Sequence, residues 1–203
     1  MIIAVTGNLG TGKSTVSKLL ASSLGAELLD TDRLCRLQLQ PGQEGFVAFT
    51  KTFGQLFLQE DGDIDRTRLR QAVFTDGRIK EALEDILHPI VRRNVEERMA
   101  ACRDRGRSLV VEVPLLYEVG WQDDFDLCVV VSVPTGVSIN RVQERDSMDV
   151  VEIDKVLSSQ LPLSQKIASA DATIDNSGTF VSTVQQVYWL ARNLTDTEQK
   201  HGN

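Results

Sequence analysis

Five short apolar runs are spaced along the chain, with enough length between them for helices. The runs from position 108 and from position 126 read SLVVEV and DLCVVVSV, and they are almost continuously apolar and rich in valine. Such runs are typical of parallel strands that are covered by helices on both faces. The pattern predicts strands at residues 1–6, 26–29, 108–113, 126–133 and 172–174, the last of them weak.

The segments between these strands show the helical spacing of apolar residues. A helix follows the first strand, and residues 31–107 are predicted to be mostly helical with breaks at glycines. An apolar stripe around Pro89 predicts a helix that is kinked or restarted at that proline. Residues 135–166 are predicted to be helical and highly charged, and an amphipathic helix precedes the polar end. Because strands and helices alternate, we expect one α/β domain with a parallel sheet.

The chain has more acidic than basic residues, which argues against some classes of binding partner. The 203 residues include 22 Lys and Arg against 29 Asp and Glu, a formal net charge of −7. A general nucleic-acid binder needs an excess of basic residues to displace counterions, so we expect no nucleic-acid partner. No apolar run reaches the length of a membrane span and no export signal is visible, so we expect no membrane partner. Three widely spaced cysteines indicate a reducing cytoplasm rather than a metal cluster.

A glycine-rich loop follows the first strand. Residues 7–14 read GNLGTGKS and fit the pattern G-x-x-x-x-G-K-[ST]. Glycines let backbone N–H groups turn inward around phosphate oxygens, and the helix that follows adds its positive N-terminal end. Lys13 can reach the β- and γ-phosphates, and Ser14 can ligate Mg²⁺. The loop therefore predicts a nucleoside triphosphate site with Mg²⁺ at Ser14.

This loop fixes the ligand class but leaves three classes of protein open. A GTPase switch should have an N-K-x-D motif, which the sequence lacks, and a motor ATPase needs more length and an apolar run that ends in Asp, where this chain has Glu112. A small-molecule kinase needs an acceptor pocket, a base beside it and mobile arginines. A regulator that only binds nucleotide would keep the loop but could dispense with the base.

Polar clusters follow other strands at the positions where a parallel sheet binds its ligands. Asp30 and Asp32 follow the second strand, residues 114–118 (PLLYE) follow the third, and residues 176–178 (NSG) follow the fifth. Asp32 is the best candidate for a base that accepts the proton of the acceptor hydroxyl. The alternative is that it caps a helix.

Two pairs of residues at helical spacing are further candidates. His88 and Arg92 lie on either side of a His-Pro break and could face one acceptor group, or could be a capping histidine and a solvated arginine. Arg141 and Arg145 could belong to a lid that aims guanidinium groups at the phosphates, or to a solvated surface helix. Spacing alone leaves both interpretations open for each pair.

Several motifs, taken together, resemble the dephospho-CoA kinase family. They cover residues 3 to about 190 in the family's order: TGNLGTGKST, LLDTDRL, DGDIDRTRLRQAVF, LEDILHPIVR, VEVPLLYE, INRVQERD, SSQLP and SADATIDNSG. The HP-x-x-R and V-P-L-L-[FY]-E segments are specific to this family, whereas the phosphate loop is shared with very many NTPases. The sequence differs from the family at Asn8, where glycine is usual.

The resemblance implies phosphate transfer from ATP, with Mg²⁺, to the ribose 3′-hydroxyl of dephospho-CoA, the last step of coenzyme A synthesis. It implies a P-loop NTPase core with a five-stranded parallel sheet and helices on both faces, made of residues 1–32 and 108–195. Within the core, a short lid is expected at about residues 136–166. A helical acceptor-binding insertion is expected at residues 33–107 and a polar tail at 196–203. ATP and dephospho-CoA are the implied partners of a cytoplasmic monomer or weak homo-oligomer.

The resemblance also implies roles for individual positions. Asp32 is expected to be the base, with Lys13 and Arg141 as the other catalytic groups. The expected nucleotide-binding residues, which include a lid arginine and an adenine contact, are Gly10, Thr11, Gly12, Lys13, Ser14, Thr15, Arg145 and Asn176. The expected acceptor-binding residues are Asp32, Arg66, His88, Arg92, Pro114, Leu115, Leu116 and Glu118. Another P-loop small-molecule kinase, such as a nucleotide kinase, is the alternative, and the VPLLYE and HP segments speak against it.

Overall fold

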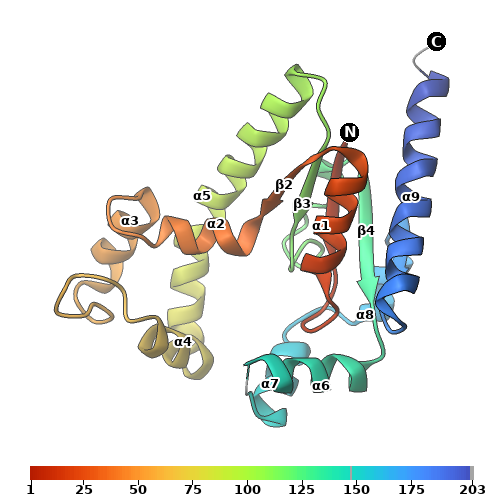
Figure 1. Cartoon of the computed structure of the whole chain (residues 1–203). Coiled ribbons are helices and arrows are strands. Elements are labelled where there is room, and N and C mark those ends of the chain that lie inside the picture. Colours follow the sequence, from red (N-terminus) through yellow and green to blue (C-terminus); the bar gives the residue numbers. More distant parts are fainter. Residues whose placement is uncertain (147, 202–203) are drawn as a thin grey trace. The chain divides into compact units, whose positions relative to one another are not determined.

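The chain is divided into two compact units in the computed structural model, which describes residues 1–146 and 148–201. The sheet unit comprises Met1–Asp30 and Ala101–Asn203, and the helical unit comprises Thr31–Ala100. Strands alternate with helices in the sheet unit, as the apolar pattern predicts (Figure 1). The two units are described separately below.

The sheet has five parallel strands in the order β2-β3-β1-β4-β5 (Figure 1). The strands are β1 (Ile2–Thr6), β2 (Glu27–Asp30), β3 (Leu109–Glu112), β4 (Leu127–Ser132) and β5 (Ala172–Asp175). All five residues of β1 are buried, because this strand lies at the centre between β3 and β4. Since every pairing is parallel, the carboxyl ends of the strands meet at one edge of the sheet. The predicted five-stranded parallel sheet is confirmed.

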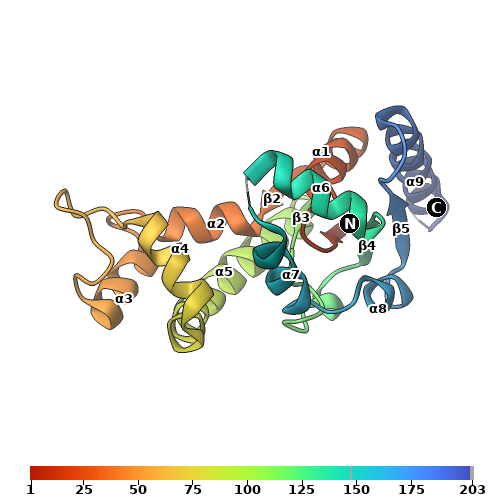
Figure 2. The same ribbon diagram turned by 90° about the horizontal axis from the view of Figure 1, so that it is seen from below.

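Helices cover both faces of the sheet. α1 (Lys13–Leu24) and α9 (Phe180–His201) lie side by side on one face, and α8 (Leu163–Ala168) packs against β4 on the other face (Figures 1 and 2). The two sides of each strand alternate, so every second residue of β1 and β4 faces α1 and α9. The core on that face is formed by Ile3, Val5, Val16, Leu20, Ala21, Val110, Val129, Val131, Ile174, Val187, Leu190 and Ala191.

The charged stretch after β4, which was predicted to be helical, forms three helices. α6 (Thr135–Asp146) and α7 (Val150–Ser158) pack together around Val142 and Ile153, and α8 follows after Pro162. Asp149 starts α7 with a capping box, in which its side chain accepts a hydrogen bond from the Glu152 N–H at 2.7 Å. The predicted helical content is therefore correct, but two turns divide it.

The helical unit has its own core. Its elements are α2 (Thr31–Gln38), α3 (Glu44–Phe53), α4 (Arg66–Thr75) and the greater part of α5 (Gly77–Asp104). Phe49, Phe53 and Phe57 form a cluster of tilted and edge-on rings, with Phe49 fully buried. Ile64 and Leu69 complete the buried centre of this cluster. The insertion between the second and third strands therefore folds around side chains of its own.

The α5 helix continues through Pro89, so the helix does not restart at that residue. A proline inside a helix removes one backbone hydrogen bond and costs about 3 kcal/mol. Leu87, Ile90 and Val91 flank Pro89 and are all buried. Burial of these side chains on both sides of the proline offsets the lost bond and keeps the helix intact.

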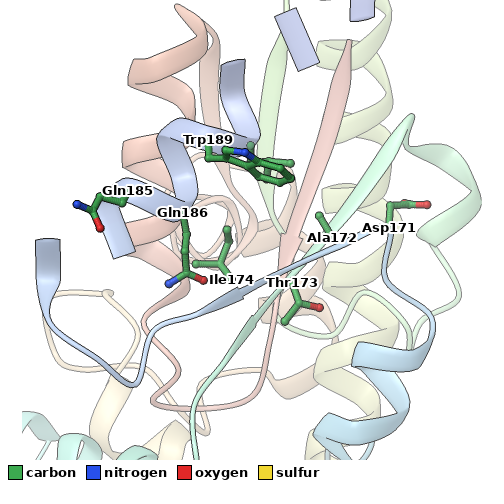
Figure 3. Close-up of a pocket in the computed structure, with 8 residues that line it drawn as sticks. Asp171, Ala172, Thr173, Ile174, Gln185, Gln186 and Trp189 are labelled. Atoms are coloured by element: carbon green, nitrogen blue, oxygen red, sulfur yellow. The ribbon is translucent and has the colours of Figure 1, made fainter. Parts of the chain in front are cut away.

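A pocket of about 500 Å³ lies between β5 and α9, away from the phosphate loop (Figure 3). The indole of Trp189 projects from α9 toward the strand, which supplies Ala172, Thr173 and Ile174 to the lining. None of the residues predicted from the sequence to bind a substrate lines this pocket. Over the described parts of the chain, no helix has the length and apolar character required to cross a membrane.

Candidate functional site

The phosphate loop, residues 7–14, joins the central strand β1 to helix α1 and has a tightly constrained backbone. Gly10 and Gly12 have φ angles of 77° and 87°, a region that side chains disfavour. A Cβ atom on Gly10 would lie 2.5 Å from the carbonyl oxygen of Ser138 in α6, and one on Gly12 would collide with the side chain of Asn176. Both glycines are therefore required by backbone angle and by close neighbours, and the loop passes directly beneath α6.

Lys13 folds back over this loop. Its Nζ donates a hydrogen bond to the carbonyl oxygen of Asn8 at 3.1 Å, and the Thr11 hydroxyl donates to the same oxygen at 2.9 Å. Gly12 stands before the first turn of α1, and no side chain of the described residues caps that turn. The positive end of α1 and the Lys13 ammonium thus lie at the same loop, an arrangement that attracts phosphate.

The outer side of the loop is held by the segment that follows α7. The Leu9 N–H donates to the Gln160 side-chain oxygen at 3.0 Å, and the Asn8 side chain donates to the Leu161 carbonyl at 3.2 Å. Leu9 also packs against the apolar cluster between α6 and α7. Asn8 stands where glycine is usual in the family that the sequence resembles, and its side chain adds a hydrogen bond that glycine could not form. Gln160 was not predicted from the sequence, where it is one polar residue among many.

Ser14 and Glu112 form the part of the site that suits a hard cation. The Ser14 hydroxyl donates to Glu112 Oε1 at 2.7 Å, and Glu112 is only 6% exposed at the end of β3. Burial raises the pKa of Glu112, and the neighbouring Asp30 carboxylate adds to this effect, while Ser14 and Lys13 oppose it. Hydroxyl and carboxylate oxygens are the ligands that Mg²⁺ prefers.

Within the described residues, no group of three or more His, Cys, Asp and Glu side chains is arranged to hold a metal ion by itself. Mg²⁺ usually takes few protein ligands and fills its remaining positions with water and substrate phosphates. The pair of Ser14 and Glu112 therefore fits a Mg²⁺ ion that arrives with a nucleotide.

Asn176 and Arg141 meet at the inner side of the loop. The Asn176 Nδ2 donates to the Thr11 carbonyl at 2.8 Å, and the Asn176 backbone carbonyl accepts a hydrogen bond from Arg141 Nη2 at 2.9 Å. The Asn176 Oδ1 accepts from the Thr183 hydroxyl at 2.8 Å. Three elements, β5, α6 and α9, thus converge on one turn of the phosphate loop.

The two predicted lid arginines differ in their surroundings. The Arg141 guanidinium lies beside Gly12, whereas Arg145 is exposed and forms two hydrogen bonds to its neighbour Asp146, at 2.9 and 2.6 Å. These bonds raise the pKa of Arg145. Arg141 thus borders the phosphate loop, whereas Arg145 pairs with Asp146, the next residue of its own helix.

The loop after β3 is anchored by a buried ion pair. Lys166 of α8 is 1% exposed, and its Nζ lies 2.8 Å from Glu118 Oε1 and 3.3 Å from the Pro114 carbonyl. Glu118 Oε1 also accepts the Leu161 N–H at 2.9 Å, and the Thr6 hydroxyl donates to the Pro114 carbonyl at 3.3 Å. Lys166 was missed because a lysine in a charged helix normally points to solvent.

Of the other residues predicted in this loop, Leu116 is fully buried in the sheet unit, while Pro114 and Leu115 are half-buried. Thr15 is exposed in the first turn of α1, next to Ser14. These positions leave Leu115 and Pro114, rather than Leu116, with surface that a ligand could contact.

Four predicted acceptor residues belong to the helical unit. Asp32 is exposed in the first turn of α2, which begins at Thr31. It is therefore a residue of the helix itself and not the N-cap residue that precedes it. Arg66 Nη2 donates to the carbonyl of Arg36 at 3.3 Å, which links the start of α4 to α2. His88 and Arg92 lie on α5, both half-buried.

Comparison with known proteins identifies relatives of the whole chain. A family described as dephospho-CoA kinase matches residues 1–182. The dephospho-CoA kinase of Desulfotalea psychrophila is 37% identical over 94% of this chain and 96% of its own length. That of Anaeromyxobacter dehalogenans is 39% identical over 87% of this chain and 84% of its own.

Solved structures agree with the sequence comparison. The dephospho-CoA kinase of Campylobacter jejuni is similar with a TM-score of 0.72 at 25% identity, covering 97% of this chain and 98% of that one. A Thermus thermophilus protein, TT1252, is similar with a TM-score of 0.78 at 30% identity over 97% of both chains. The shikimate kinase of Aquifex aeolicus, with a TM-score of 0.51 at 15% identity over 95% of this chain and 96% of that one, shares the fold.

Proposed function

The chain belongs to the dephospho-CoA kinase family, and on that premise we propose how its residues transfer phosphate from ATP to dephospho-CoA. The ribose 3′-oxygen of dephospho-CoA forms a bond to the γ-phosphorus of ATP. The bond from that phosphorus to the oxygen bridging to the β-phosphate breaks, and the hydroxyl proton passes to a base. The products are coenzyme A and ADP, so the reaction is the last step of coenzyme A synthesis.

The structural observation that supports ATP as the phosphate donor is the constrained phosphate loop at the carboxyl edge of the sheet. The backbone N–H groups of Gly10 to Thr15 and the Lys13 ammonium would hold the β- and γ-phosphates. Arg141, which lies beside Gly12, would face the charge that develops on the transferred group. These groups are held in place before ATP binds, which lowers the cost of reorganisation in the transition state.

Ser14, with Glu112 behind it, would hold Mg²⁺ when the nucleotide is bound. The ion would supply positive charge that neutralises the phosphate oxygens as the bond to the leaving group breaks. The Ser14 oxygen would offer a lone pair to the ion, while the hydroxyl keeps its hydrogen bond to the Glu112 carboxylate, 2.7 Å away. Glu112 would thereby orient Ser14.

Asp32 would be the base that accepts the proton of the 3′-hydroxyl. Its carboxylate lies in the first turn of α2 and is exposed, so a bound acceptor can reach it. Arg66, His88 and Arg92 would bind anionic groups of dephospho-CoA from the same helical unit. Pro114, Leu115 and Glu118 would also contact dephospho-CoA, as the family resemblance implies.

Release of ADP with different acceptors tests the activity. ADP release should be stimulated by dephospho-CoA, and much less by AMP, CMP or no acceptor, and mass spectrometry should identify coenzyme A as the product. Stimulation by AMP or CMP alone would identify a nucleotide kinase instead. ATP turnover that is independent of any acceptor would contradict a kinase function.

Asp32→Asn tests the base. The change keeps the size of the side chain but removes the carboxylate, so transfer should fall by roughly 10²–10⁴-fold with little change in ATP affinity. Asp85→Asn is a matched control, because Asp85 is an exposed aspartate on α5 of the same unit. Full activity of Asp32→Asn would remove Asp32 from the mechanism.

We further propose that the enzyme works in the cytoplasm as a monomer or weak homo-oligomer. Its net charge of −7 speaks against a nucleic-acid partner, and its three cysteines are free thiols.

A further inference from the structure

Asn176 joins three elements of the sheet unit at the phosphate loop. It follows β5, and its side-chain amide uses both of its ends: Nδ2 donates to the Thr11 carbonyl at 2.8 Å, and Oδ1 accepts from the Thr183 hydroxyl at 2.8 Å. Thr183 belongs to α9 and is fully buried. Because the Thr183 hydroxyl donates a hydrogen bond to Oδ1, the Asn176 amide is oriented with its Nδ2 group toward the phosphate loop.

The bond to Thr11 fixes the orientation of a peptide group in the phosphate loop. In a trans peptide the carbonyl oxygen of one residue and the N–H of the next point in opposite directions. With the Thr11 oxygen held by Asn176, the Gly12 N–H is turned away from Asn176. Gly12 has a φ of 87°. Without the hydrogen bond from Asn176 to Thr11, this glycine could adopt other backbone angles at little cost in free energy.

We propose that Asn176 is a positioning residue, which locks the Thr11–Gly12 peptide so that the Gly12 N–H faces the phosphates. This inference rests on one part of the proposed function, namely that the loop binds the polyphosphate of a nucleotide. It differs from the adenine contact that the family resemblance implies, because the bonds to Thr11 and Thr183 give the amide a role within the protein that needs no adenine. Arg141 bonds the backbone carbonyl of Asn176, so replacing the side chain leaves the partner of this arginine in place.

The test compares ligands with and without an adenine base. The dissociation constants of MgADP and of inorganic tripolyphosphate with Mg²⁺ are measured by calorimetry for the wild type and Asn176→Ala. Loss of a buried neutral hydrogen bond should weaken both ligands by a similar factor, about 5- to 50-fold. Because tripolyphosphate has no base, an adenine contact would weaken MgADP only, and that result would overturn the proposal.

Two further variants separate positioning from stability. Thr183→Val keeps the shape of the side chain but removes the bond that orients the amide, so it should weaken both ligands in the same direction by a smaller factor. Ser177→Ala is the control, because Ser177 is the exposed neighbour of Asn176 and its bonds go to Asp175, which lies outside the phosphate loop. If Asn176→Ala does not fold, as judged by circular dichroism, Thr183→Val still decides the question.

Tripolyphosphate affinity within twofold of the wild type in both folded variants would refute the positioning role. The binding measurement needs no acceptor. A wild type that bound both ligands but failed to phosphorylate dephospho-CoA would therefore count against the proposed function and not against this role of Asn176.

Discussion

Replacement of Lys166 by methionine should destabilise the sheet unit strongly. The Lys166 side chain is fully buried and its partner Glu118 is 14% exposed, so water screens this ion pair little. Lys166→Met would keep most of the volume of the side chain and remove the charge. Glu118 would then keep the Leu161 N–H as a hydrogen-bond donor, and its Oε2 is buried with no partner among the described residues.

The expected magnitude follows from the burial of the pair. Removal of one partner from a buried ion pair costs about 3–5 kcal/mol, because the remaining charge is left uncompensated. For a chain of this size, that range corresponds to a fall in melting temperature of roughly 6–20 °C. An exposed pair would contribute about 0–1 kcal/mol and a change too small to separate from error.

Intrinsic fluorescence gives a suitable assay, since Trp121 and Trp189, the two tryptophans of the chain, both belong to the sheet unit. Urea and thermal unfolding followed by tryptophan emission therefore report on the unit that contains the ion pair. Lys155→Met is the matched control, because Lys155 is an exposed lysine on α7, and its melting temperature should stay near that of the wild type.

A double variant tests the cause of the loss. Glu118→Gln removes the charge that Lys166→Met leaves unpaired and keeps an oxygen for the Leu161 N–H, so the double variant should be more stable than Lys166→Met alone. A melting temperature of Lys166→Met within 2 °C of the wild type would refute the assignment of a stabilising buried pair. A double variant less stable than Lys166→Met would show that charge is not the cause.

Two other predictions follow from the site and its surroundings. Arg141→Ala should lower kcat far more than Arg145→Ala, since Arg141 lies beside Gly12 whereas Arg145 pairs with Asp146. Steady-state kinetics with ATP and dephospho-CoA that gave equal losses would contradict this difference. Burial raises the pKa of Cys128 from 9.0 to about 11 and that of Tyr117 from 10.0 to about 12, so the folded state keeps both protons where the unfolded state loses them. The free energy of unfolding should therefore be insensitive to these groups below pH 9 and fall between pH 9 and about 12. Urea unfolding across that range checks this, and a matching fall in a Cys128→Ala, Tyr117→Phe variant would exclude these groups as its cause.

The sequence was informative where one side chain or one backbone angle decides the structure. The glycine pattern of residues 7–14 predicted the loop, and the apolar runs predicted five strands and their parallel direction, but not their order in the sheet. Restart of the helix at Pro89 was not observed, because burial on both sides of the proline overrides a local preference that the sequence shows clearly. The division of residues 135–166 into three helices depends on caps at Asp149 and Pro162, which a charge pattern does not reveal.

Contacts between residues far apart in the chain could not be predicted from the spacing of residues in the sequence. Asn176 and Thr11 are 165 positions apart, and the chain between Glu118 and Lys166 forms β4, α6 and α7. Their side chains meet because parallel strands bring separate loops to one edge, which a list of residue types cannot specify. The roles of Asp32, Arg66, His88 and Arg92 stay predictions that the variants above can test.

The central place of β1 in the sheet determines the order in which the chain can fold during synthesis. Ile2 pairs with Leu109 and Ile3 with Leu127, so β1 has no strand partner until about 100 further residues have been made. At a synthesis rate of roughly 5–20 residues per second, this interval lasts roughly 5–20 s. During that time the helical unit can assemble around its phenylalanines, whereas the apolar segment Ile2–Thr6 remains unpaired and prone to aggregate. Of the strands in the sheet, β1 therefore stays unpaired for the longest part of synthesis.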